Sequence, residues 1–211
     1  MKVTITPTKL SGTIEAIPSK SHAHRVLIAL RLAQLAGGNI SLQIPSFNKD
    51  IEATKACLAA LDTDCPRLDC NESGSTIRFM IPVAMALKEE ATFIGSGKLP
   101  QRPLSPLKEE MEAHGCKFNM TGNVGNGVEI CTINGKLTAG EYKLAGNVSS
   151  QFITGLLFAL PILDGDSSLA LTTKLESAGY VDLSLDVLRA FGITINQGTN
   201  DEGFIVYNIP G

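Results

Sequence analysis

The residues best suited to chemistry stand at the start of an expected helix. They are Lys20, Ser21 and Arg25, within residues 18–25. An apolar run follows, and Gly37-Gly38 ends it, as expected for a helix. Ser21 and Arg25 share one helix face, beside the unpaired N–H groups and partial positive charge of the helix start. A hydroxyl, an ammonium and a guanidinium there suit a phosphate or a carboxylate, although an ordinary helix cap with two solvated cations explains this stretch equally well.

Two more expected helices open in a similar way. Residues 72–78 read Glu-Ser-Gly-Ser-Thr-Ile-Arg, with Gly74 at the helix start and Arg78 one turn later. Residues 147–151 read Asn-Val-Ser-Ser-Gln, and both stretches lead into apolar runs. Serine is a favoured helix cap in any protein, so three such starts could also arise by chance.

Two further positions suit a binding site. Arg102 lies between two prolines in the loop of residues 97–103. Because the prolines restrict the backbone and sites gather on rigid loops, we favour an anion-binding role over a solvated surface arginine. Ser177 and Tyr180 open a last helix, where Tyr180 either faces a ligand or lies in the core with its hydroxyl solvated.

The composition excludes several classes of protein. With 44% hydrophobic and 18% charged residues, the 211-residue chain is globular and not disordered. A net charge of -3, 5% aromatic residues and no tryptophan argue against a nucleic-acid partner. The five cysteines lack metal-ligand spacing and the N-terminus lacks the apolar core of a signal peptide, so we expect reduced thiols, no metal and a cytoplasmic protein. The apolar runs are interrupted too early for a membrane span.

The chain repeats an order of helix, strand, helix and strand. We expect units at about residues 18–70, 71–144 and 145–211, with an Asn134-Gly135 hairpin turn in the second. Three buried opening helices under outer sheets would bring their N-termini to one end, which favours an anion site over ordinary caps. The expected helices cover residues 20–36, 50–61, 77–87, 103–114, 151–163 and 179–191. The expected strands cover residues 40–44, 67–69, 91–95, 116–120, 128–130, 168–173, 193–195 and 204–208, and two more lie within residues 2–17.

Taken together, these stretches resemble the 5-enolpyruvylshikimate-3-phosphate synthase family. The resemblance rests on residues 18–25, 72–78, 101–104 and 146–152, and more weakly on residues 176–182. It implies an α/β fold, an inside-out α/β barrel domain of three repeats with the helices buried and the sheets outside. It also implies transfer of the enolpyruvyl group from phosphoenolpyruvate to the 5-hydroxyl of shikimate 3-phosphate in chorismate biosynthesis, by a monomeric enzyme without a cofactor.

The resemblance also implies residue roles. Lys20 would contact both substrates, and the remaining residues would divide between the two. Shikimate 3-phosphate would be bound by Ser21, Arg25, Ser149, Ser150, Ser177 and Tyr180. Phosphoenolpyruvate would be bound by Gly74, Arg102 and Gln151. Fixed cations and helix N-termini suit two phosphorylated substrates and would position the attack.

The chain departs from the family pattern in two respects. Glu72 stands where many members have asparagine, and we assign it no ligand contact. The family's enzymes are about twice as long, so the chain looks like their N-terminal half, with residues 1–17 belonging to a second, C-terminal domain. That domain supplies the proton-transferring groups in the family, so we expect this chain to be inactive alone.

Other functions remain open. A UDP-N-acetylglucosamine enolpyruvyl transferase shares the implied fold, but its hallmark cysteine is absent from residues 95–102. The RNA 3′-phosphate cyclases share the repeat but not these motifs. A non-enzymatic domain that binds an organic phosphate is the alternative from another class.

Overall fold

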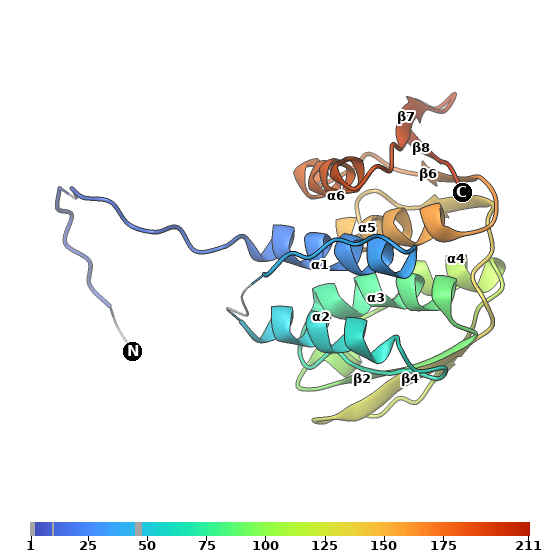
Figure 1. Cartoon of the computed structure of the whole chain (residues 1–211), viewed down its shortest axis with the longest axis horizontal. Helices are drawn as coiled ribbons and strands as arrows, with labels where there is room; N and C mark the ends of the chain where they lie inside the picture. Colours follow the sequence, from blue (N-terminus) through green and yellow to red (C-terminus); the bar gives the residue numbers. More distant parts are fainter. Residues whose placement is uncertain (1–2, 10, 45–47) are drawn as a thin grey trace.

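The computed structural model describes residues 3–9, 11–44 and 48–211, and it contains two open four-stranded sheets with helices between them (Figure 1). The strand orders are β1-β2-β4-β3 and β5-β6-β8-β7. In each sheet the first pair is parallel and the other two pairs are antiparallel. The strands are β1 (Arg67–Asp69), β2 (Glu90–Gly95), β3 (Lys117–Met120), β4 (Val128–Asn134), β5 (Glu141–Leu144), β6 (Ser167–Leu171), β7 (Asn196–Thr199) and β8 (Ile205–Ile209).

Each sheet comes from one continuous stretch of chain with the order β-α-β-α-β-β. Residues 67–134 form the first copy and residues 141–209 the second. The two copies therefore repeat one topology, and helices α1 and α2 precede them. The helices are α1 (Lys20–Leu35), α2 (Lys49–Ala60), α3 (Gly74–Leu87), α4 (Leu107–Ala113), α5 (Ser150–Ala159) and α6 (Ala178–Ala190), with short 3₁₀ turns η1 (Leu99–Gln101) and η2 (Leu160–Ile162). No helix of the described ranges is both long and apolar enough to cross a bilayer.

The strands predicted near the N-terminus are absent from the described residues. Residues 3–9 and 11–17 run away from the helices as extended, exposed chain, and residues 40–44 form no strand either (Figure 1). The apolar side chains of residues 3–9 and 11–17 face solvent, with Ile5 85% and Ile14 91% exposed. A strand needs a neighbour to satisfy its backbone hydrogen bonds, and no described strand pairs with these segments. Residues 1, 2 and 10 of the predicted hairpin lie outside the described residues.

Three other predictions were wrong in detail. The helix predicted for residues 103–114 begins only at Leu107, because Pro106 disfavours helical backbone at the residue before it. The predicted turn at Asn134-Gly135 instead ends β4, and the hairpin joins β3 to β4 through residues 121–127. Gly135 donates its backbone N–H to the Glu89 carbonyl, one position beyond the last paired residues of β2 and β4. The last hairpin uses β7 in place of residues 193–195.

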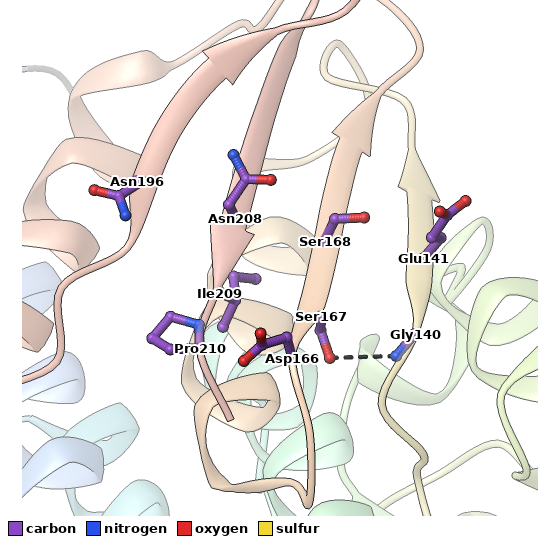
Figure 2. Close-up of a pocket in the computed structure, with 9 residues that line it drawn as sticks. All are labelled: Gly140, Glu141, Asp166, Ser167, Ser168, Asn196, Asn208, Ile209 and Pro210. Carbon is purple, nitrogen blue, oxygen red and sulfur yellow. Dashed lines mark hydrogen bonds between the residues drawn. The ribbon is translucent and has the colours of Figure 1, made fainter.

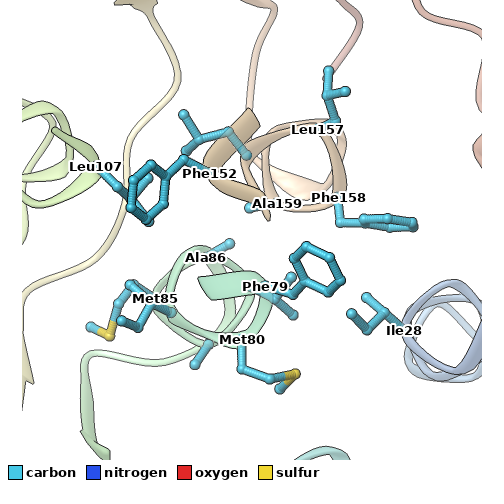
Figure 3. Close-up of a cluster of buried hydrophobic side chains, with 14 of the residues drawn as sticks. Ile28, Phe79, Met80, Met85, Ala86, Leu107, Phe152, Leu157, Phe158 and Ala159 are labelled. Atoms are coloured by element: carbon cyan, nitrogen blue, oxygen red, sulfur yellow. The ribbon is translucent and has the colours of Figure 1, made fainter. Parts of the chain in front are cut away.

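The core lies around α3 and α5, which are buried on almost every side. Figure 3 shows side chains of α1, α3, α4 and α5 meeting there. Pro82 interrupts the hydrogen bonding of α3, because a proline cannot donate to the carbonyl four residues earlier, that of Arg78. The backbone of α5 passes close to that carbonyl at Gly155, where a Cβ atom would lie 2.5 Å from the oxygen and 2.8 Å from Pro82 Cγ.

Substituting Gly155→Ala is therefore expected to destabilise the protein by about 1–3 kcal/mol, because neither helix backbone can move without disturbing the core. Gly179→Ala is the control, since Gly179 is also helical but has open space where the Cβ would lie. It is expected to be neutral or stabilising by up to about 1 kcal/mol. Urea unfolding measures the stability of both variants. Equal midpoints for Gly155→Ala and the wild type would contradict the close approach of the α5 backbone to α3.

Candidate functional site

Four helices begin around one open cavity of about 420 Å³, namely α1, α3, α5 and α6. Ser19, Ser73 and Ser149 cap the first three, each accepting a hydrogen bond from a backbone N–H of the first turn. The predicted convergence of the three opening helices is confirmed, and the positive ends of their dipoles favour an anion in this cavity. The lining residues are Lys20, Ser21, His24, Arg25, Ser75, Phe79, Val148, Ser149, Ser150, Gln151, Ser177 and Tyr180.

Arg25 is a buried cation in the wall of this cavity, only 2% exposed. Its guanidinium donates to Ser184 Oγ at 2.8 Å, Thr154 Oγ1 at 3.2 Å and the carbonyls of Ser21 and Tyr180 at 2.6 and 2.9 Å. It also lies over the Phe79 ring. Among the described residues no carboxylate pairs with it, and burial lowers the pKa of Arg25 to about 10. An uncompensated buried charge favours binding of an anion.

Lys20 lies at the rim of the cavity and forms an ion pair with Asp50. Its Nζ lies 2.7 Å from Asp50 Oδ2, and its side chain is 48% exposed. Asp50 comes from α2, near the start of that helix. The carboxylate thus holds the ammonium beside the cavity, where it remains accessible to a ligand.

His24 contributes a buried imidazole to the same wall. Its Nδ1 shares a hydrogen bond of 2.7 Å with Thr54 Oγ1, and Thr54 in turn bonds Thr76 Oγ1 at 2.7 Å. Its Nε2 is buried and has no partner among the described residues. Burial, chiefly, lowers the pKa of His24 to about 4, with Lys20 and Arg25 adding to this and Asp50 opposing it. The ring is therefore neutral at pH 7.

Gln151, which also lines the cavity, joins α5 to α3. Its Oε1 accepts from Arg78 Nη1 at 2.7 Å, and its Nε2 donates to Ser75 Oγ at 2.8 Å. Burial and the nearby charge of Arg102 lower the pKa of Arg78. Arg102 itself lies against the start of α3, so close that a Cβ at Gly74 would be 2.5 Å from Nη1. Two guanidiniums thus lie near one helix N-terminus.

The cavity can bind and orient a small oxyanion that carries hydroxyl groups. The lining residues include cations, hydroxyls and an amide but no carboxylate. Ser177 holds the left-handed backbone conformation, with φ 56°, which is uncommon for a residue other than glycine and often marks a functional position. The lining residues include no carboxylate, His24 is neutral and Lys20 is held in an ion pair, so the cavity itself offers little for proton transfer.

A second hollow, of about 480 Å³, crosses the outer face of the sheet β5-β6-β8-β7 (Figure 2). It carries the carboxylates of Glu141 and Asp166 and no lysine or arginine among its lining residues. The charge of this hollow is therefore wrong for an anion. The remaining lining residues are Gly140, Ser167, Ser168, Asn196, Asn208, Ile209 and Pro210.

The structure brings most of the predicted site residues together. Eight of them line the one cavity, while Gly74 and Arg102 contact each other just outside it. Glu72 lies against Gly97 and does not line the cavity. The eight are Lys20, Ser21, Arg25, Ser149, Ser150, Gln151, Ser177 and Tyr180.

Sequence reasoning missed a supporting set of residues. His24 and Ser75 line the cavity, Asp50 pairs with Lys20, and Arg78 holds Gln151. Ser75 and Arg78 lie inside the motif at residues 72–78, which could have drawn attention to them. No local pattern marks the pairing of Asp50 with a lysine thirty positions earlier.

Comparison with known proteins identifies relatives. Residues 48–208 match the family model described as EPSP synthase (3-phosphoshikimate 1-carboxyvinyltransferase). A 3-phosphoshikimate 1-carboxyvinyltransferase of Clostridium kluyveri is 41% identical over 223 aligned positions, covering 97% of this chain and 50% of that protein. The protein of that name in Clostridium novyi is 39% identical, covering 97% of this chain and 52% of its own length. The chain therefore spans about half the length of the curated relatives that it matches.

The fold has a counterpart among solved structures. EPSP synthase from Acinetobacter baumannii superposes with a TM-score of 0.63 at 18% sequence identity. The superposition covers 90% of this chain and 45% of that one. At this identity the likeness supports the fold alone.

Proposed function

This chain belongs to the EPSP synthase family, and we propose that it forms one half of the active site of a 3-phosphoshikimate 1-carboxyvinyltransferase. The reaction transfers the enolpyruvyl group of phosphoenolpyruvate to the 5-hydroxyl of shikimate 3-phosphate. A carbon–oxygen bond forms at that hydroxyl, its proton is released, and inorganic phosphate leaves. The other half, a C-terminal domain, supplies the groups that move protons.

One observation above all supports this proposal. Four helix N-termini surround a cavity whose wall holds Arg25, a buried guanidinium without a carboxylate partner among the described residues. Such a site costs stability unless an anion completes it. Shikimate 3-phosphate provides a phosphate, a carboxylate and two hydroxyls, which suit the cations and serines of the wall.

The substrates divide between two parts of the site. Lys20 contacts both substrates from the rim, and Gly74, Arg102 and Gln151 receive phosphoenolpyruvate near the start of α3. Shikimate 3-phosphate is held by Ser21, Arg25, Ser149, Ser150, Ser177 and Tyr180. Residues 3–9 and 11–17, whose apolar side chains are exposed, pair with strands of the C-terminal domain.

A titration tests the binding half of this proposal. Adding shikimate 3-phosphate to the purified chain is expected to shift the backbone amide NMR signals of Lys20, Arg25, Ser149, Ser150 and Tyr180. Lys20→Ala is expected to weaken this binding by about tenfold, the contribution of one charged hydrogen bond. The control Lys117→Ala removes an equal charge from an exposed position on β3 and leaves the affinity unchanged.

Three results would contradict the proposal. The absence of shifts at millimolar ligand would mean that this half does not bind the substrate by itself. Shifts confined to the hollow around Asn196 and Asn208 would place binding elsewhere. Release of phosphate from phosphoenolpyruvate by the purified chain would show that it needs no second half.

A further inference from the structure

The carboxamide of Gln151 is held at both ends by side chains of α3. Arg78 Nη1 donates to its Oε1 at 2.7 Å, and its Nε2 donates to Ser75 Oγ at 2.8 Å. Gln151 and Ser75 line the cavity, whereas Arg78 does not. Arg78 therefore contacts the cavity wall through Gln151.

The chemistry of arginine decides which way this amide points. A guanidinium has five N–H donors and no acceptor, so the atom that faces it must be the amide oxygen. The amide nitrogen then faces Ser75, and its second N–H has no partner among the described residues. Gln151 consequently offers the cavity a hydrogen-bond donor.

Arg78 is itself fixed in place. Its guanidinium lies over the Phe152 ring, with Cζ 5.1 Å from the ring centre, and Nη2 donates to the Pro103 carbonyl at 3.5 Å. A half-buried guanidinium with these contacts loses little rotamer freedom when it bonds the amide. The orientation of Gln151 is thus determined before any ligand arrives.

We infer that Arg78 is a positioning residue that keeps the Gln151 amide turned so that it donates to a substrate oxyanion. This inference rests on the proposed function, because it concerns the same cavity. Without Arg78 only Ser75 holds the amide, and because a serine hydroxyl can bond either the oxygen or the nitrogen, the amide can turn its oxygen toward the anion. A carbonyl oxygen facing an oxyanion repels it, so the orientation matters as much as the presence of the amide.

The experiment is a double-mutant cycle read by two measurements. Phosphoenolpyruvate affinity is measured with shikimate 3-phosphate present for the wild type, Arg78→Met, Gln151→Ala and the double variant, and the Gln151 side-chain amide signals are followed by NMR without ligand. Arg78→Met is expected to weaken binding about tenfold, as expected for loss of one hydrogen bond to a charged group. In the Gln151→Ala background Arg78→Met is expected to weaken binding less than about threefold. This smaller effect is what the loss of the Arg78 charge alone contributes. Arg78→Lys, which keeps a donor and the charge, is expected to recover part of the affinity.

The two measurements separate this inference from the proposed function. Gln151 amide signals that are identical in the wild type and Arg78→Met overturn the inference, even where binding is intact. An equal loss of affinity in both backgrounds also overturns it, because Arg78 then acts without Gln151. If the wild type binds neither phosphoenolpyruvate nor shikimate 3-phosphate, the proposed function fails, while amide signals that change in Arg78→Met still support the fixed orientation.

Discussion

Replacing Arg25 with methionine is expected to weaken shikimate 3-phosphate binding by about a hundredfold and to leave the protein at least as stable as before. Four of the five N–H groups of Arg25 bond protein oxygens, so the loss of affinity reflects one charged hydrogen bond to the ligand together with the loss of the buried positive charge. Loss of a buried arginine with four hydrogen bonds would ordinarily suggest a large loss of stability as well. The contacts around it indicate the opposite.

The groups that bond Arg25 keep other partners after it is removed. Thr154 Oγ1 and Ser184 Oγ lie 2.9 Å apart and bond each other, and Ser184 also donates to the Tyr180 carbonyl. The Ser21 carbonyl keeps the backbone hydrogen bond of α1. Methionine fills a similar volume without a charge, and replacing buried charges by apolar side chains is often neutral or stabilising.

Urea unfolding and a shikimate 3-phosphate titration of the same variant test both parts. Arg189→Met is the control, because Arg189 lies on α6 in an exposed ion pair with Asp186. It is expected to keep the wild-type affinity. A variant Arg25→Met that unfolds at much lower urea would mean that Arg25 serves the fold, and unchanged affinity would remove it from the site.

The sequence predicted those parts of the site that depend only on neighbouring residues in the chain. Serine caps and the cations beside them follow from a few neighbouring residues, so Lys20, Arg25, Ser149 and Gln151 could be placed at helix starts from the amino-acid sequence alone. The repeat of apolar helices then predicted that those starts converge. This placed most of the wall correctly.

The sequence failed where a structural feature depends on distant partners. Residues 40–44 alternate as a strand should, but alternation does not supply a neighbouring strand, and none is described there. Likewise the pairing of Asp50 with Lys20 depends on how α2 packs beside α1. The residues that hold the site in place through distant partners, such as Asp50 and Ser184, are therefore visible only in the fold.

His24 provides the second large effect, a loss of stability in acid. Its pKa is about 4 in the folded protein against 6.5 ordinarily, mainly because it is buried, with the charges of Lys20 and Arg25 acting in the same direction. Between these two values the unfolded chain binds a proton that the folded protein does not. Stability therefore rises with pH in this range and is lost as the pH falls from 6.5 toward 4. The loss is expected to reach about 3 kcal/mol.

The contacts of the imidazole explain why protonation is costly. Nδ1 is committed to Thr54, and Nε2 is buried with no acceptor among the described residues, so an added proton there would be desolvated and unpaired. His24→Asn keeps a polar group near Thr54 but cannot be protonated. Its free energy of unfolding is therefore expected to lack the loss of about 3 kcal/mol that the wild type shows as the pH falls from 6.5 toward 4. Urea unfolding at pH 7 and pH 4.5 measures the difference, with His22→Asn as a control on the exposed side of α1. If His24→Asn and the wild type lose equal stability over this range, the buried imidazole is not the group that responds to acid.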